Sequence, residues 1–182
     1  MQPIRQLMQG LERQASTVYT LHAPEDLRGL VPDISEAAFK TLLSRAVQQN
    51  YLERVCRGIY LYKKGAPTGL VLFHAAARLR ANDFNYISLE TALSDAGVIS
   101  QMLLNWVTIM SSGRSNVIDC GRWGRIEFVH TNQRPEDLSE QLIYDDQCRL
   151  WRAKVPLALR DMRVTHRDLG LIDWSVVDEF VR

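Results

Sequence analysis

The chain has 182 residues, of which 46% are apolar and 24% are charged, with a formal net charge of +1. This length suits one large domain or two small ones, and the composition is that of globular proteins, which excludes wholesale disorder. No apolar run approaches the roughly 20 residues that cross a bilayer, and the start of the sequence lacks the apolar stretch of a secretory signal. We therefore expect a cytoplasmic protein with no membrane partner.

The charges are unevenly divided along the chain. Residues 1–65 carry nine Lys or Arg against six Asp or Glu, whereas the remainder carries thirteen against fifteen. A mildly basic first third permits DNA binding without demonstrating it. The cysteines Cys56, Cys120 and Cys148 have no paired spacing and no neighbouring histidine, so we expect reduced, structural thiols and neither a metal nor a cofactor.

Three helices are expected in the first 50 residues. The first has apolar residues at helical spacing, Ile4, Leu7, Met8 and Leu11. An extended segment at 18–21 follows, and Pro24 then starts a brief second helix that ends near Leu30. Asp33 or Ser35 can cap the third helix, whose apolar face is the most regular in the chain and consists of Phe39, Leu42, Leu43, Ala46 and Val47.

The opposite face of this third helix offers polar side chains without a carboxylate: Lys40, Thr41, Ser44, Arg45 and Gln48. Lys and Arg can meet phosphates or guanine, Gln can pair with adenine, and hydroxyls can contact phosphate oxygens, so the mixture suits a helix in the major groove of DNA. A merely solvated helix face is the alternative on this helix alone.

A β-hairpin is predicted directly after the third helix. Asn50 closes the helix, residues 51–55 and 59–62 form the strands, and residues 56–58 form the turn. Four cations lie at its tip and exit, Arg54, Arg57, Lys63 and Lys64, where they can grip the phosphate backbone. Three helices and a basic hairpin predict a winged helix-turn-helix DNA-binding domain over residues 1–64, with a winged helix used only for protein contact as the alternative.

A connector rich in charge, glycine and proline spans residues 63–69, so we expect a second domain over residues 70–182. Its first helix, 70–81, is apolar over most of its circumference, and His74 in it is interpreted as a core side chain. A short helix follows with Ser88 as its cap and Gly97 as its stop.

Strand patterns at 106–110, 116–120 and 125–130 indicate an antiparallel meander, and 142–151 adds further strand. Helices are expected at 155–165 and at 174–181, the last with Asp173 as a cap and with the end of the sequence inside it. The predicted fold class is α+β: a winged helix followed by an α/β domain with a smaller sheet.

The second domain shows no convergent chemistry, so we do not expect an enzyme. Residues 111–115 lack the lysine of a phosphate loop and are interpreted as a turn. Asp145 and Asp146 are adjacent and are interpreted as a solvated pair. An enzyme acting on nucleic acid would need His130, Asp119 and Asp145 in one cleft.

Two segments carry a resemblance to a known family: residues 42–60, LLSRAVQQNYLERVCRGIY, and residues 86–94, YISLETALS, with Gly97 shortly after. With the rest of the front module they cover about half of the chain. The chain resembles the AbiEi antitoxins of abortive-infection, type IV toxin-antitoxin systems, which join a winged helix to a distinct antitoxin domain.

The resemblance implies an autorepressor that binds inverted repeats in its own promoter, which admits a homodimer on DNA. It also implies that the second domain counters a nucleotidyltransferase-like toxin encoded next door, without a stable complex. The alternative is a stand-alone transcriptional regulator of a mobile element whose second domain dimerises or senses a ligand. A neighbouring nucleotidyltransferase gene favours the antitoxin.

Overall fold

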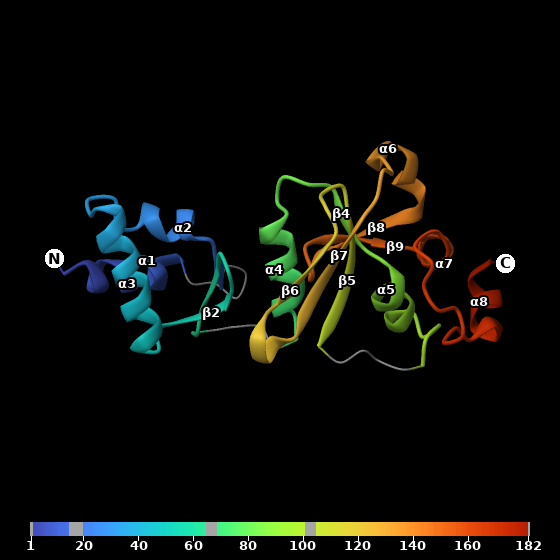
Figure 1. The fold of residues 1–182 in the computed structure, drawn as a ribbon, viewed down its shortest axis with the longest axis horizontal. Helices are drawn as coiled ribbons and strands as arrows, with labels where there is room; N and C mark the ends of the chain where they lie inside the picture. Colours follow the sequence, from blue (N-terminus) through green and yellow to red (C-terminus); the bar gives the residue numbers. More distant parts are fainter. Residues whose placement is uncertain (1, 15–19, 65–68, 101–104, 182) are drawn as a thin grey trace. The chain divides into compact units, whose positions relative to one another are not determined.

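The computed structural model describes residues 2–14, 20–64, 69–100 and 105–181. These form two compact units, Met1–Val71 and Leu72–Arg182, which we call unit 1 and unit 2. Each unit combines helices with its own β-sheet, so the chain is α+β (Figure 1). Part of the expected extended segment at 18–21 and most of the connector at 63–69 lie outside the described residues.

Unit 1 alternates helices with a small antiparallel sheet. Its elements in chain order are α1 (Pro3–Gln14), β1 (Leu21–His22), α2 (Pro24–Gly29), α3 (Glu36–Gln48), β2 (Leu52–Cys56) and β3 (Ile59–Tyr62). The strand order is β1-β3-β2, and both pairings are antiparallel. The three expected helices and the hairpin are confirmed at these positions.

The core of unit 1 comes from the apolar faces that the sequence spacing predicts. One cluster unites side chains of all three helices and the hairpin, including Leu7, Leu11, Leu27, Phe39, Leu42, Leu43, Ala46 and Leu52. Ser35, not Asp33, caps α3, because its hydroxyl accepts the backbone N–H of Ala38 at 3.2 Å. Burial of this apolar stripe fixes which face of α3 remains in solvent.

Two residues with positive φ shape the hairpin. Asn50 (φ 64°) ends α3 in the left-handed region, and the backbone N–H of Tyr51 then bonds to the carbonyl of Ala46 at 2.9 Å. Gly58 (φ 85°) forms the two-residue turn together with Arg57. The strands pair from Leu52 with Tyr62 to Cys56 with Ile59, which places Arg57 at the tip.

Unit 2 is built on a larger sheet flanked by helices. Its elements are α4 (Val71–Leu79), β4 (Asn85–Ile87), α5 (Leu89–Asp95), β5 (Trp106–Ser111), β6 (Asn116–Asp119), η1 (Gly121–Trp123), β7 (Arg125–His130), α6 (Pro135–Leu138), η2 (Ser139–Gln141), β8 (Leu142–Asp145), β9 (Leu150–Ala153), α7 (Val155–Val164) and α8 (Trp174–Val181). The six strands have the order β6-β7-β5-β4-β9-β8, so the expectation of a smaller sheet in this half is wrong.

The expected antiparallel meander is also wrong, because β7 lies between β5 and β6. β7 pairs antiparallel with β6 but parallel with β5, from Trp106 with Arg125 to Ser111 with His130. β4 likewise pairs antiparallel with β5 and parallel with β9, so the sheet is mixed. Residues 112–115 therefore connect two strands that are not neighbours, although their Ser-Gly composition resembles that of a hairpin turn.

Helices cover both faces of the sheet in unit 2. Figure 1 shows α4 on one side of the strands, with α5 and α7 on the other. On the first side the guanidinium of Arg80, just after α4, lies 4.4 Å from the ring centroid of Phe128 in β7. On the second, α5 packs against both β5 and α7. This double cover explains why β5 is buried along nearly its whole length while the edge strand β6 is mostly exposed. No helix among the described residues is long and apolar enough to span a membrane.

Candidate nucleic-acid interface

The solvent face of α3 presents the polar set that the sequence spacing predicts. All five side chains are exposed: Lys40, Thr41, Ser44, Arg45 and Gln48. They share a face because they lie three or four residues apart, opposite the buried apolar stripe. The set consists of five side chains that can each donate hydrogen bonds to a partner, and two of them are cationic.

Three of these five side chains have contacts within α3 or at its start. The hydroxyls of Thr41 and Ser44 donate to the carbonyls of Ala37 and Lys40 at 3.0 and 3.1 Å, so each would rotate to donate to a ligand. The Lys40 ammonium lies 3.7 Å from the carboxylate of Glu36, one turn earlier. Both of these charges are exposed, so the pair contributes little to stability. Glu36 is a carboxylate beside the predicted face, which the sequence argument left out.

The hairpin adds two exposed arginines, Arg54 on β2 and Arg57 at the tip. Within the described part of the chain, neither side chain has a hydrogen bond or an ion pair, and the same holds for Arg45 on α3. Because no carboxylate of the described residues neutralises them, these three guanidiniums remain available for an anionic partner.

Lys63 and Lys64, which follow β3, are engaged within unit 1. The ammonium of Lys63 donates to the side-chain carbonyl of Asn50, at the end of α3. Lys64 lies 2.8 Å from the carboxylate of Glu12 on α1. That hydrogen bond and the negative charge of Glu12 raise the pKa of Lys64. Both lysines are exposed, yet they differ from the three arginines because each already has a partner.

In unit 2 the segment 86–94, which carries the family resemblance, lies in the interior. Ser88 is the N-cap residue of α5, as expected, but its side chain makes no capping hydrogen bond. Its hydroxyl instead donates to the Asp161 carboxylate of α7 at 2.7 Å. Burial raises the pKa of Asp161, against the lowering effect of that hydrogen bond. The Tyr86 hydroxyl is buried near the same carboxylate, and burial together with the charge of Asp161 raises the pKa of Tyr86.

A second set of buried polar residues forms hydrogen bonds between the α5 region and β5. The Thr108 hydroxyl donates to the carbonyl of Ser88 at 2.7 Å, and the backbone N–H of Thr108 bonds to the Thr91 hydroxyl at 2.8 Å. All three residues are at most 9% exposed. Their hydrogen bonds satisfy groups that would be costly to bury unpaired, so this segment stabilises unit 2 from inside.

The titratable side chains of unit 2 do not converge. His74 is buried and its Nε2 lies 2.6 Å from the Gln147 carbonyl, as expected for a core histidine; burial lowers its pKa. Asp119 lies opposite Arg125, at the end of β7 distant from His130. Asp145 lies on β8, at the opposite edge of the sheet from β6. The three groups of the enzyme alternative are therefore not brought together.

Asp145 is not the solvated carboxylate that the sequence suggested. It is half-buried, and its Oδ2 accepts a hydrogen bond from Arg152 at 2.9 Å. Its partial burial would raise its pKa, but hydrogen bonds from the Cys148 backbone and from Arg152 lower it. Arg152 also contacts Asp95 at 2.5 Å, so the group is an ion-pair network joining α5, β8 and β9.

The loop 111–115 is held as a turn against α4. Arg80 donates to the carbonyl of Arg114 and to the side chain of Asn116, each at 2.8 Å. A side chain at Gly113 would meet the Arg80 guanidinium, which would have to shift from its present position.

No metal-binding cluster of three or more His, Cys, Asp or Glu side chains occurs among the described residues. All three cysteines are free and buried, as expected. No family model matches the chain, and no curated protein matches it. The candidate site is therefore the exposed face of α3 together with the hairpin, where the sequence predicts contacts with DNA.

Proposed function

We propose that unit 1 is a winged helix-turn-helix domain that binds duplex DNA and that the protein is a transcriptional autorepressor. The observation that carries this proposal is the exposed polar face of α3 beside a hairpin with an arginine at its tip. In helix-turn-helix proteins the second helix of the motif enters the major groove and its side chains meet the base edges. Here α2 and α3 would form the motif.

Each part of the interface would have a distinct role. Arg45 can donate two hydrogen bonds to the O6 and N7 of guanine, and Gln48 can pair with adenine. Glu36, which pairs with Lys40, would be repelled by phosphates but could accept a hydrogen bond from the amino group of cytosine. Arg57 at the hairpin tip would bind the phosphate backbone, which gives affinity without sequence preference.

The operator is expected in the upstream region of the gene itself, as inverted repeats, in line with the AbiEi resemblance. The test is a reporter gene under that promoter, with the protein expressed from a separate plasmid. Repression by the native protein, lost in Arg45→Ala and retained in the matched control Arg13→Ala on α1, supports the proposal. Equal reporter activity with and without the native protein contradicts it.

We further propose that unit 2 is an antitoxin domain that counters a nucleotidyltransferase-like toxin encoded next door without a stable complex. This proposal is supported by the likeness of residues 86–94 to the AbiEi family. Growth rescue on co-expression with that toxin tests it directly. Because the antitoxin role is assigned to unit 2, growth rescue should persist in the Arg45→Ala variant. Loss of rescue in that variant would contradict the assignment of the antitoxin role to unit 2.

A second candidate is a regulator whose unit 2 senses a ligand. The observation that favours it is a pocket of about 220 Å3 lined by the aromatic side chains of Phe84, Tyr144 and Trp151. Tyr144 and Trp151 form an edge-on pair with ring centroids 5.2 Å apart and are both exposed. An effector that changes reporter repression, together with failure to rescue growth, would favour this candidate over the antitoxin.

A further inference from the structure

An exposed groove runs along α1, and no residue of α3 lines it. Its volume is about 290 Å3, and its α1 lining consists of Ile4, Arg5, Met8, Gln9 and Glu12. Tyr51 contributes an aromatic ring that is 42% exposed, and Ile4 and Met8 are only partly buried against the core. The groove is therefore an apolar strip with the cation of Arg5 at one end and the ion pair of Glu12 with Lys64 at the other.

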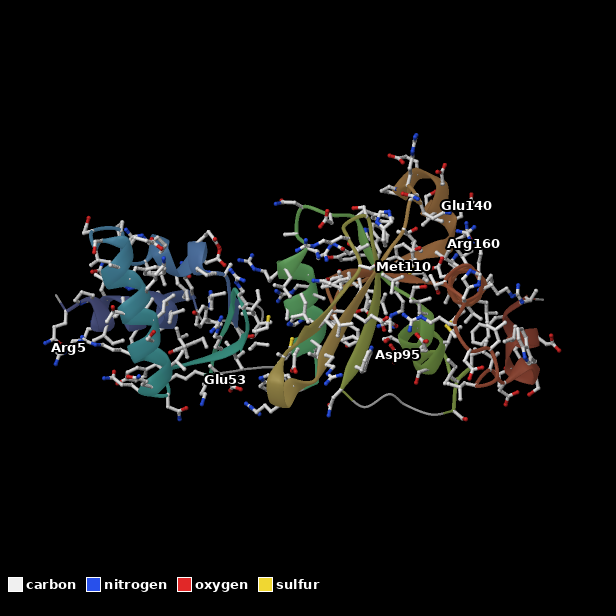
Figure 2. All side chains as sticks on the ribbon, viewed as in Figure 1. Arg5, Glu53, Asp95, Met110, Glu140 and Arg160 are labelled. Carbon is white, nitrogen blue, oxygen red and sulfur yellow. The ribbon has the colours of Figure 1, made fainter. Side chains whose placement is uncertain are left out.

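On α1 itself, the two charged side chains of the groove are opposite in sign and lie on one face of the helix. Arg5 and Glu12 are seven residues apart, which is about two helical turns or 10 Å along the axis. Arg5 extends outward from α1 (Figure 2), and among the described residues its side chain has no hydrogen bond or ion pair. Glu12 is 53% exposed and pairs with Lys64 at the rim of the groove.

We propose that this groove binds the α1 helix of a second copy of the chain in antiparallel orientation. A two-fold axis between Met8 and Gln9 would bring Arg5 of each copy to the Glu12 carboxylate of the other, which it would share with Lys64. Two such charged contacts would flank an apolar centre. A parallel arrangement would instead place like charges together. The charge pattern is thus self-complementary only in the arrangement that a closed two-fold dimer requires.

This pairing rests on the proposed function in one respect: it would supply two α3 reading helices for the two halves of an inverted repeat. One helix per copy is a small contact, well below the area of a standard stable interface. We therefore expect a dimer whose formation depends on protein concentration, and DNA with two half-sites should favour it by holding both copies close together.

Sedimentation velocity of the full chain without DNA tests the pairing. The sedimentation coefficient should rise with concentration for the native protein. Arg5→Glu and Glu12→Arg should each weaken the dimer about tenfold or more, because each replaces two attractive contacts by two repulsive ones. The control Arg13→Glu makes the same charge change on exposed α1 surface outside the groove and should leave dimerisation unchanged.

The decisive measurement is an equimolar mixture of the two weakened variants. One variant carries two glutamates and the other two arginines, so a mixed dimer has matched charges at both ends and should form where neither variant dimerises alone. A native protein that stays monomeric up to its solubility limit, or a mixture that stays monomeric, overturns the inference.

Anisotropy on a duplex with a single half-site separates this result from the proposed function. If the protein binds the half-site but does not dimerise, the proposed DNA binding stands and the proposed α1 pairing is wrong. If the protein dimerises but does not bind DNA, the α1 pairing stands and the proposed function is wrong.

Discussion

Arg45 is the side chain whose removal bears most directly on base reading. It is exposed in the middle of the polar face of α3 and has no described partner, so its loss should leave unit 1 folded. We expect Arg45→Ala to weaken operator binding by about 1 to 3 kcal/mol and to relax sequence preference at one base pair. Anisotropy titrations of both proteins measure this, and unchanged affinity would contradict the assignment of the reading face.

Arg57 should behave differently, because a phosphate contact carries no sequence information. Arg57→Ala is expected to weaken binding to operator and unrelated DNA by similar factors. The slope of log affinity against log salt concentration should fall by about one. A salt series on both DNAs gives this slope, and an unaltered slope would show that the hairpin tip does not contact the backbone.

Asp161 links the stability of unit 2 to pH. Because burial raises its folded-state pKa, the folded protein holds the proton more tightly than the unfolded chain does. Stability from this group should therefore be complete below the unfolded pKa and decline as pH rises toward the folded pKa. Asn at this position mimics the protonated form and can still accept from Ser88. Thermal melts of Asp161→Asn and native protein should diverge as pH rises above about 4, whereas parallel curves would contradict the buried charge.

At the scale of elements, the hairpin depends on the left-handed turn at Gly58. A side chain there meets no neighbour, so the cost of Gly58→Ala would come from backbone conformation alone. We expect it to destabilise unit 1 by about 1 kcal/mol. Gly29→Ala, also free of neighbours but at the end of α2 without positive φ, is the matched control and should be neutral or slightly stabilising. Urea unfolding compares them, and equal effects would refute the backbone explanation.

Helices and strands were predictable from sequence where their signals are local. The spacing of Phe39, Leu42 and Ala46 predicts both the buried and the polar face of α3, and the turn Arg57-Gly58 sets the hairpin. Strand partners are not local information. The pattern of apolar and polar residues in β5 and β7 would be the same whether these strands are parallel neighbours or have another strand between them. The mixed sheet could therefore not be predicted.

The same limit applies to the polar groups. Ser88 and Asp161 are 73 residues apart in sequence, and only the packing of α7 against α5 brings them together. The pairing of Lys64 with Glu12 likewise joins two ends of unit 1. The positions of the candidate DNA contacts could be read from one helix and one hairpin, whereas their intramolecular partners could not.

At the scale of the whole molecule, a mildly basic unit is joined to a mixed-sheet unit whose titratable side chains do not converge among the described residues. Residues 1–65 have more Lys and Arg than Asp and Glu, and the rest of the chain has slightly more Asp and Glu than Lys and Arg. This division permits a polyanion as the partner of the first unit and a different partner for the second.

Fluorescence anisotropy of the full chain on its own upstream DNA, against scrambled DNA of equal length and across a salt series, tests DNA recognition most directly. We expect the promoter to bind on the order of a thousandfold more tightly at physiological salt, with affinity for both DNAs falling as salt rises. Equally weak binding to the two DNAs would mean that unit 1 is not a sequence-specific DNA reader and that its α3 face serves a protein contact instead.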